Sequence, residues 1–294
     1  MADSDPLATL RRQGLLLGLI GAGIQASRSP MIHMAEAAAQ GVPCVYRLID
    51  IDRLGVAPDA LEPLLQAAER MGFAGLNITY PCKQTILPLL HDLSDEARAL
   101  GAVNTVVLRD GRRIGHNTDC SGFGESFRRG LAGVLMDRVV QIGTGGAGSA
   151  VAHAIVAAGA GCLTLFDLDQ ARAEHLAADL CARFGPGRAV AGVDLAASMA
   201  ATDGLVNATP MGMAKHPGLP LPAELLRPAL WVAEVVYVPL DTELVRTARA
   251  RGARVLDGGG MAVFQAAHAF ALFSGLTPDA ERMLAGFRAA LAAG

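Results

Sequence analysis

Residues 139–148 read VVQIGTGGAG, an apolar run that ends in three glycines. Gly143, Gly145 and Gly148 stand at the spacing GxGxxG. Because residues 138–143 predict a buried strand and residues 147–158 predict a helix, the glycines lie where a strand turns into a helix. There the first glycine permits a tight turn, the second lets a ligand approach the backbone, and the third lets the helix pack closely on the strand. The stretch therefore predicts a phosphate-binding βα turn.

An acidic residue indicates which ligand this turn binds. Asp167 ends the next predicted strand, CLTLFD (162–167), about 20 residues after Gly148, which is the usual distance in dinucleotide-binding units. A carboxylate at this point accepts hydrogen bonds from a ribose 2′-hydroxyl and repels a 2′-phosphate. The amides at the start of the helix attract the pyrophosphate. We therefore expect a dinucleotide-binding unit, and the alternative is a loop that serves packing alone.

Alternation of strands and helices extends along almost the whole chain of 294 residues, which is long enough for two domains. It predicts an α/β fold with parallel sheets covered on both faces. The expected strands are 15–21, 45–51, 75–79, 138–143, 162–167, 189–194, 204–209, 231–237 and 254–258, with a hairpin in 102–119 that turns at Asp110-Gly111. The expected helices are 30–40, 58–71, 84–90, 147–158, 170–184, 261–274 and 278–293, and a helical stretch near 122–134 bridges the two series.

Polar residues gather where the strands of the first half end. Because ligands of open parallel sheets bind outside the carboxyl ends of the strands, such residues are candidates for a binding site. Their hydroxyl, amide, ammonium and carboxylate groups suit a small polyhydroxylated acid, since each unmatched group would carry a penalty. Taken singly, each could instead stabilise a turn. The set is Ser27, Ser29, Asn77, Thr79, Lys83, Asn104, Asn117, Thr118 and Asp119.

Composition excludes several other functions. The net charge of −3 gives no basic face for nucleic acid. The N-terminal residues MADSDPLATLRRQG do not resemble a signal peptide, and no long apolar run predicts a membrane span. The five cysteines form no CxxC pair and fit a reducing, cytoplasmic location. The seven histidines form no HExxH motif, so we expect no metal.

Six ordered motifs resemble those of the shikimate/quinate dehydrogenase family. The family pattern S-x-S-x-S-P is similar to SRSP (27–30), and N-[VI]-T-x-P-x-K is similar to NITYPCK (77–83). G-A-V-N-T and N-T-D-x-x-G are similar to GAVNTV (101–106) and GHNTDCSGF (115–123). N-A-T-x-x-G-M is similar to NATPMGM (207–213), and D-G-x-x-M-x-x-x-Q-A is similar to DGGGMAVFQAAHAF (257–270). The resemblance runs along nearly the whole chain.

This resemblance implies the oxidation of one ring hydroxyl of shikimate, or its reverse, with a hydride passing to NAD(P). Lys83 and Asp119 would form the catalytic pair, and which of them is the base stays open because their titrations are coupled. Pro81 would end its strand so that Lys83 turns toward the reacting oxygen. The residues implied to contact substrate are Ser27, Ser29, Asn77, Thr79, Asn104, Tyr237 and Gln265, with the first two holding its carboxylate.

The resemblance also implies two domains with the active site in the cleft between them. The substrate-binding catalytic domain, with a mostly parallel sheet, would comprise residues 1–122 and the C-terminal helices 261–294. A Rossmann-type, doubly wound dinucleotide-binding domain would comprise residues 123–260. The expected cofactor-binding residues are Gly143, Gly145, Gly146, Ala147, Gly148, Asp167, Arg172, Thr209, Met211 and Gly258.

One departure from the family pattern bears on the choice of cofactor. NADP-using members carry N-R-[TS] after the second strand of the nucleotide domain, whereas this chain has Asp167-Leu168-Asp169. Two carboxylates repel a 2′-phosphate, so we predict NAD over NADP, with Arg172 as a residue that could still reach a phosphate. Quinate or an amino analogue of shikimate is an alternative main substrate, and an NAD-binding sensor is the alternative without catalysis. Monomer and dimer both fit the sequence.

Overall fold

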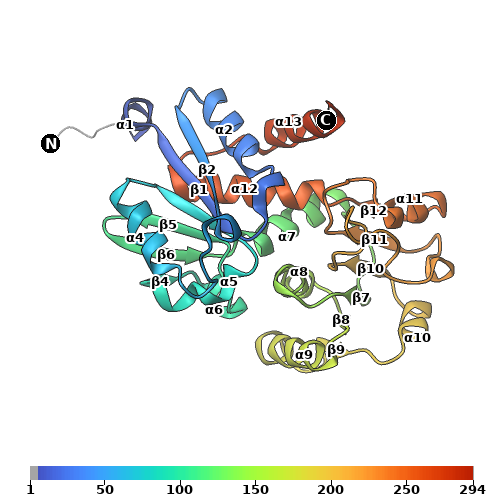
Figure 1. Cartoon of the computed structure of the whole chain (residues 1–294). Helices are drawn as coiled ribbons and strands as arrows, with labels where there is room; N and C mark the ends of the chain where they lie inside the picture. Colours follow the sequence, from blue (N-terminus) through green and yellow to red (C-terminus); the bar gives the residue numbers. More distant parts are fainter. Residues whose placement is uncertain (1–5, 294) are drawn as a thin grey trace. The chain divides into compact units, whose positions relative to one another are not determined.

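The computed structural model describes residues 6–293 (Figure 1), so the first five residues of the N-terminal stretch 1–14 lie outside the described part of the chain. The chain divides into two compact units. Unit 1 contains the residues up to Thr118 and those from Val263 onward, and unit 2 contains Asp119–Ala262. Two helices, α7 (Thr118–Gly130) and α12 (Gly259–Ser274), carry the chain from one unit to the other.

Unit 1 is built on a six-stranded mixed sheet with the order β2-β1-β3-β5-β6-β4. The pairs β1–β2, β1–β3 and β4–β6 are parallel, and β3–β5 and β5–β6 are antiparallel. The elements are α1 (Pro6–Gln13), β1 (Leu15–Gly21), η1 (Ile24–Ala26), α2 (Ser29–Ala39), β2 (Cys44–Asp50), α3 (Ile51–Leu54), α4 (Glu62–Arg70), β3 (Gly75–Ile78), α5 (Cys82–Thr85), η2 (Leu87–Leu89), β4 (Asp92–Leu93), α6 (Asp95–Leu100), β5 (Thr105–Arg109), β6 (Arg112–His116) and α13 (Ala280–Ala293).

Alternating side chains of β1 supply two cores on opposite faces of this sheet. Leu17 and Leu19 pack with Phe270 of α12 on one face, whereas Ile20 packs with Leu65 of α4 on the other. This alternation follows from the twofold side-chain period of a strand. The carboxyl ends of β1 and β3 are thereby held side by side, with Ile20 opposite Ile78.

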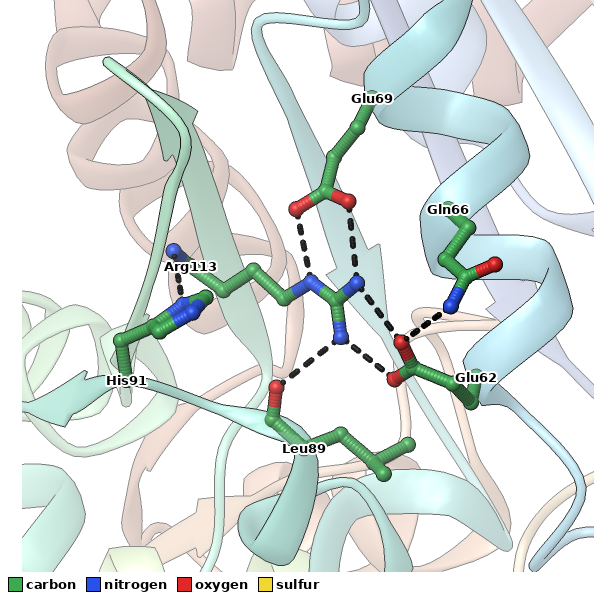
Figure 2. A network of polar contacts seen from close by, with 6 residues as sticks. All are labelled: Glu62, Gln66, Glu69, Leu89, His91 and Arg113. Carbon is green, nitrogen blue, oxygen red and sulfur yellow. Dashed lines mark hydrogen bonds and ion pairs between the residues drawn. The ribbon is translucent and has the colours of Figure 1, made fainter.

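Arg113 of β6 binds α4 to the sheet of unit 1 (Figure 2). Its guanidinium donates to both carboxylate oxygens of Glu69, at 2.7 and 2.9 Å, and to both of Glu62, at 2.5 and 3.0 Å. The backbone amide of Arg113 also donates to His91 Nδ1. The hydrogen bonds from Arg113 hold the pKa values of the Glu62 and Glu69 carboxyls below their usual range. Arg113 is 8% exposed, so its buried positive charge is stabilised by these two carboxylates.

Unit 2 is built on a six-stranded, all-parallel sheet with the order β12-β11-β10-β7-β8-β9. Counted from β7, this is the strand order of the Rossmann fold, with its switch point between β7 and β10. The elements are β7 (Arg138–Ile142), α8 (Gly146–Ala157), β8 (Cys162–Phe166), α9 (Gln170–Phe184), β9 (Ala189–Ala191), α10 (Leu195–Ala200), β10 (Gly204–Asn207), η3 (Ala223–Leu225), β11 (Trp231–Glu234), α11 (Glu243–Ala250) and β12 (Arg254–Leu256).

Both faces of the second sheet are covered by helices, which confirms the predicted α/β class and the doubly wound form. Phe123 of α7, Val151 of α8 and Leu176 of α9 belong to one core, and Met199 of α10 and Leu244 of α11 belong to the other. Among residues 6–293, no helix is long and apolar enough to cross a bilayer.

Several predicted elements are shorter in the structure than in the sequence pattern. The helix predicted at 58–71 begins at Glu62, and the one predicted at 84–90 consists of the single turns α5 and η2. The strand predicted at 189–194 ends at Ala191 because Asp194 instead caps α10 by accepting a hydrogen bond from the Ala197 amide. The pattern also missed α1, α6, α10 and α11, which are helices of only six to eight residues and so contain few turns.

Candidate active site

The glycine turn of unit 2 lies at the switch point of the parallel sheet. Gly143 follows β7 with a φ of 97°, which favours glycine, and Gly145 caps the N-terminus of α8. A Cβ on Gly148 would lie 2.3 Å from Gly143 O, whereas a Cβ on Gly145 would meet nothing within 4 Å. The backbone is therefore open to a ligand at Gly145 and closely packed at Gly148, as a pyrophosphate-binding turn requires.

Gln141 holds this turn in shape, and sequence reasoning missed it. Its buried Nε2 donates to Gly143 O and to Gly148 O, both at 2.8 Å. One side chain on β7 thus joins the first and last glycines of the motif. A polar residue inside the apolar run VVQI was the available signal.

Asp167 is tied directly to the glycine turn. Its Oδ2 accepts hydrogen bonds from the Thr144 amide and the Thr144 hydroxyl, both at 2.7 Å, and its Oδ1 accepts one from the Asp169 amide. Burial would raise the pKa of Asp167, but these hydrogen bonds and Arg172 outweigh it and hold that pKa below the usual value. The carboxylate is therefore ionised and fixed beside the turn, where it can accept from a ribose hydroxyl.

Arg172, the residue that could reach a phosphate, already has anionic partners. Its guanidinium lies 3.3 Å from Asp169 Oδ2 and 3.7 Å from Asp167 Oδ1. Asp169 also caps α9 by accepting from the Arg172 amide. Binding a 2′-phosphate here would place a dianion against two carboxylates that compete for one guanidinium.

A second loop, residues 207–213, packs against the glycine turn. A Cβ on Gly143 would lie 2.7 Å from the backbone of Ala208, so only glycine fits there. Within this loop Thr209 donates from its amide and its hydroxyl to Asn207 Oδ1, and the Met211 amide donates to Thr209 Oγ1. The predicted cofactor contacts Thr209 and Met211 are thereby fixed next to the turn that carries Gly146 and Ala147.

Gly258 and Tyr237 complete the predicted residues of unit 2. A Cβ on Gly258 would lie 2.3 Å from Val236 O, so this glycine permits the chain after β12 to touch the chain after β11. Tyr237 follows Val236 in that same segment and is 38% exposed.

In unit 1, the two predicted carboxylate-binding serines contact each other. Ser27 ends the turn that follows β1, and Ser29 begins α2. Ser27 Oγ donates to Ser29 Oγ at 3.2 Å and accepts from the Ser29 amide at 3.3 Å. Both are half-buried, so their hydroxyls are close together and reachable by a ligand.

Asn77 and Asn104 lie in one buried hydrogen-bond network. Asn77 Oδ1 accepts from the Tyr46 hydroxyl at 2.8 Å, and Asn77 Nδ2 donates to Thr105 Oγ1 at 3.1 Å. Asn104 Oδ1 accepts from the Thr118 amide at 2.7 Å. Sequence reasoning missed Tyr46, whose position in a strand gave no polar signal. Asp119 follows Thr118 directly, so the network includes the neighbour in sequence of this predicted catalytic residue.

Lys83 lies in α5, the single helical turn after Pro81. β3 ends at Ile78, the Thr79 amide donates to Ile20 O, and the Cys82 amide donates to Thr79 O. The chain thus leaves the sheet before Pro81, as the sequence indicated. The Val103 amide donates to Lys83 O at 2.9 Å, which places the lysine backbone beside the segment of Asn104. Gln265 lies half-buried in α12.

Unit 1 therefore contains Lys83 and the serine, threonine and amide groups that suit a hydroxylated acid, and unit 2 contains the dinucleotide elements and Tyr237. Within residues 6–293, no group of three or more His, Cys, Asp and Glu side chains could hold a metal ion. The chemistry open to these groups is binding of a polar acid and proton transfer at an oxygen.

Known proteins of similar sequence share this architecture. The family described as "Shikimate dehydrogenase substrate binding domain" matches residues 19–106. A shikimate dehydrogenase (NADP(+)) from Streptomyces avermitilis is 58% identical over 278 residues, which cover 94% of this chain and 96% of that protein. A quinate/shikimate dehydrogenase (NAD(+)) from Corynebacterium efficiens is 49% identical, with 95% and 99% covered.

A solved structure extends the likeness to three dimensions. Quinate dehydrogenase from Corynebacterium glutamicum in complex with NAD matches with a TM-score of 0.89 at 48% identity, covering 94% of this chain and 99% of that one. The motifs, the two sheets and relatives of this similarity over nearly the full length lead to one conclusion. The chain belongs to the shikimate/quinate dehydrogenase family, oxidoreductases that act on a CH–OH group with NAD or NADP.

Proposed function

We propose that this enzyme interconverts shikimate and 3-dehydroshikimate and prefers NAD to NADP. The substrate assignment is supported by the 58% identity to a protein named shikimate dehydrogenase and by the hydroxyl and amide groups gathered in unit 1. The observation that carries the cofactor assignment is Asp167, an ionised carboxylate held beside the glycine turn by Thr144.

The residues of unit 1 have separate roles in this proposal. Ser27 and Ser29 hold the substrate carboxylate with their adjacent hydroxyls. The ring hydroxyls are contacted by Thr79, Asn77 and Asn104, either directly or through side chains that these residues hydrogen-bond. Gln265 adds an amide from α12. Each such contact favours substrates that carry a matching hydroxyl, because an unmatched buried polar group costs binding energy.

Lys83 and Asp119 manage the proton in this mechanism. When a ketone is reduced, negative charge develops on its oxygen, and a cationic Lys83 stabilises that oxygen and donates a proton to it. In the oxidation direction the hydroxyl proton passes to this pair. We treat the two groups as one coupled pair and assign the base to neither alone.

The cofactor site is proposed from the backbone of unit 2. The open approach at Gly145 and the N-terminus of α8 fit a pyrophosphate, and Asp167 fits an unphosphorylated ribose. A nicotinamide dinucleotide bound there supplies the hydride acceptor. Thr209, Met211 and Gly258 would hold its nicotinamide end, and Gly146 and Ala147 its phosphates. The relatives are named for both cofactors, so the preference rests on this chain's own residues.

Quinate is a second candidate substrate, favoured by the names of the Corynebacterium relatives. An amino analogue of shikimate is the third candidate substrate. The proposal also includes a cytoplasmic location and a monomeric or homodimeric state. The domain boundaries at 122/123 and 260/261 stay predictions.

Initial rates with NAD and NADP, each paired with shikimate and with quinate, test the proposal. We expect turnover of shikimate and a higher kcat/KM with NAD. A higher kcat/KM with NADP would refute the argument from Asp167 and assign Arg172 to the phosphate. A higher kcat/KM with quinate would make it the main substrate. No turnover with either acid or the amino analogue, despite measurable NAD binding, would favour a sensor.

A further inference from the structure

Glu234 is a buried carboxylate that none of the roles above uses. It is the last residue of β11 and is 1% exposed, in a strand whose four residues are all buried. Burial raises the pKa of its carboxyl to about 7, although hydrogen bonds from Val236, Asn207 and Thr242 act to lower it. A carboxylate in such a place is costly unless donors surround it.

Glu234 accepts hydrogen bonds from donors on two neighbouring loops, residues 207–213 and 235–242. Oε1 accepts from Asn207 Nδ2 at 2.9 Å and from the Val236 amide at 3.0 Å, and Oε2 accepts from the Thr242 hydroxyl at 2.9 Å. The Asn207 and Val236 N–H groups can only donate, so Oε1 must remain an acceptor, whereas the Thr242 hydroxyl can donate to Oε2 or accept from it. The geometry therefore fits a carboxylate and also an acid protonated at Oε2.

Through Asn207, the carboxylate orients the loop 207–213. Because Asn207 Nδ2 donates to Glu234 and also to Met211 O, its Oδ1 is turned to accept the two hydrogen bonds from Thr209. A rotated amide would set donors against the Thr209 amide. The positions of Thr209 and Met211 thus depend on Glu234 indirectly, through the side chain of Asn207.

Through Val236 and Thr242, the same carboxylate holds both ends of the segment that carries Tyr237. The Val236 bond fixes the chain just before Tyr237, and Thr242 caps α11 by accepting from the Val245 amide at 3.2 Å. The glycine turn has its own anchors, because Gln141 and Thr144 bond to residues other than Glu234. The two ends of the dinucleotide site therefore have separate supports.

We propose that Glu234 is a positioning residue that holds the loops 207–213 and 235–242 in the shape that receives the nicotinamide end of the cofactor. It acts through Asn207, Val236 and Thr242 and leaves the adenosine and pyrophosphate end to the glycine turn. This inference rests on the proposed function, because it assigns the nicotinamide end to these loops.

Calorimetric binding of NAD and of ADP-ribose, which lacks the nicotinamide, tests the inference with Glu234→Met at pH 8. The substitution roughly keeps the size of the side chain but removes both acceptor oxygens, so Asn207 Nδ2 and the Val236 amide lose their partner. We expect ADP-ribose to bind within about twofold of wild type, NAD to bind about tenfold more weakly, and kcat to fall about tenfold or more. Glu234→Asp, which keeps the charge, should recover part of the NAD affinity.

Thr242→Val is the second variant, in case Glu234→Met fails to fold. It has nearly the same shape as wild type and removes one donor to Oε2, so NAD should bind several-fold more weakly and ADP-ribose unchanged. Equal losses for NAD and ADP-ribose, or no loss for either, would overturn the role of Glu234. If wild type binds NAD but turns over no substrate, the proposed function is refuted. The comparison of NAD with ADP-ribose binding still tests the role of Glu234 in that case. If wild type prefers NADP, then NADP and 2′-phospho-ADP-ribose replace the two ligands.

Discussion

Replacing His33 with leucine should make the stability of unit 1 much less dependent on pH. The imidazole of His33 is 1% exposed, stacks on Tyr46 with ring centroids 5.1 Å apart, and has no hydrogen-bond partner at either nitrogen. Burial lowers its pKa from the ordinary 6.5 to about 3. The folded protein therefore keeps this side chain neutral at pH values where an unfolded chain would protonate it.

The sign and size of the effect follow from this difference in proton binding. The neutral histidine's contribution to stability is fully present above pH 6.5 and is lost as the pH falls toward 3, because the unfolded state binds the extra proton. The complete loss is about 5 kcal/mol, and between pH 7.5 and 4.5 it is about 2.7 kcal/mol. In His33→Leu this part of the pH dependence should disappear.

Amide hydrogen exchange in β1 measures the free energy of opening of unit 1 separately from unit 2. We expect the wild type to lose at least about 2.7 kcal/mol between pH 7.5 and 4.5, since its carboxylates contribute in the same direction, and His33→Leu to lose about that much less. Phe270→Leu, which loosens the same core but keeps the histidine, is the control and should keep the wild-type slope. Parallel curves for wild type and His33→Leu would refute the reasoning.

Four further outcomes are expected. Arg113→Met should destabilise unit 1 by about 2–4 kcal/mol in the same exchange experiment, because Glu62 and Glu69 lose their shared cation; an unchanged opening free energy would mean that solvent already screens the cluster. Gly204→Ala should destabilise unit 2 by at least about 1–3 kcal/mol, because its Cβ would lie 1.9 Å from the Trp231 ring; urea unfolding monitored by Trp231 fluorescence measures the change. Gly286→Ala should instead stabilise the chain by up to about 1 kcal/mol, because a Cβ at this position of α13 meets open space. Lys83→Ala should lower kcat by about two orders of magnitude or more, and near-normal kcat would remove the lysine from the mechanism. Asp167→Asn should lower the ratio of kcat/KM for NAD to that for NADP several-fold, and an unchanged ratio would place cofactor choice elsewhere.

The sequence predicted most of the fold because its signals are local. The glycines of VVQIGTGGAG each meet a backbone demand that the structure shows: a φ of 97° at Gly143, open space at Gly145 and close packing at Gly148. Asp110-Gly111 likewise predicted the turn between β5 and β6. The short helix α10 was missed because the apolar run before it continued the strand pattern, and the cap at Asp194 was the stronger signal.

The candidate site was predicted as a set of residue types, whereas their supports were not. Ser27, Asn77 and Asn104 could be selected because polar groups follow strand ends and because the motifs resemble a family. Tyr46 and Glu234 could not, since each lies in a strand and its partner is far away in sequence. Gln141 bonds to the nearby Gly143 and Gly148, and its place in the apolar run VVQI was a signal that the pattern did not use.

The sequence by itself determined the α/β class, the phosphate-binding turn and the acid beside it, because backbone conformation and side-chain period depend on neighbours along the chain. Only the tertiary structure decided which donors meet which carboxylate. Thr144 reaches Asp167 and Asn207 reaches Glu234 because parallel strands bring their carboxyl ends to one edge of the sheet. Pairing between strands is a property of the folded sheet, so the shape of the loops that would receive the cofactor is a property of the folded sheet as well.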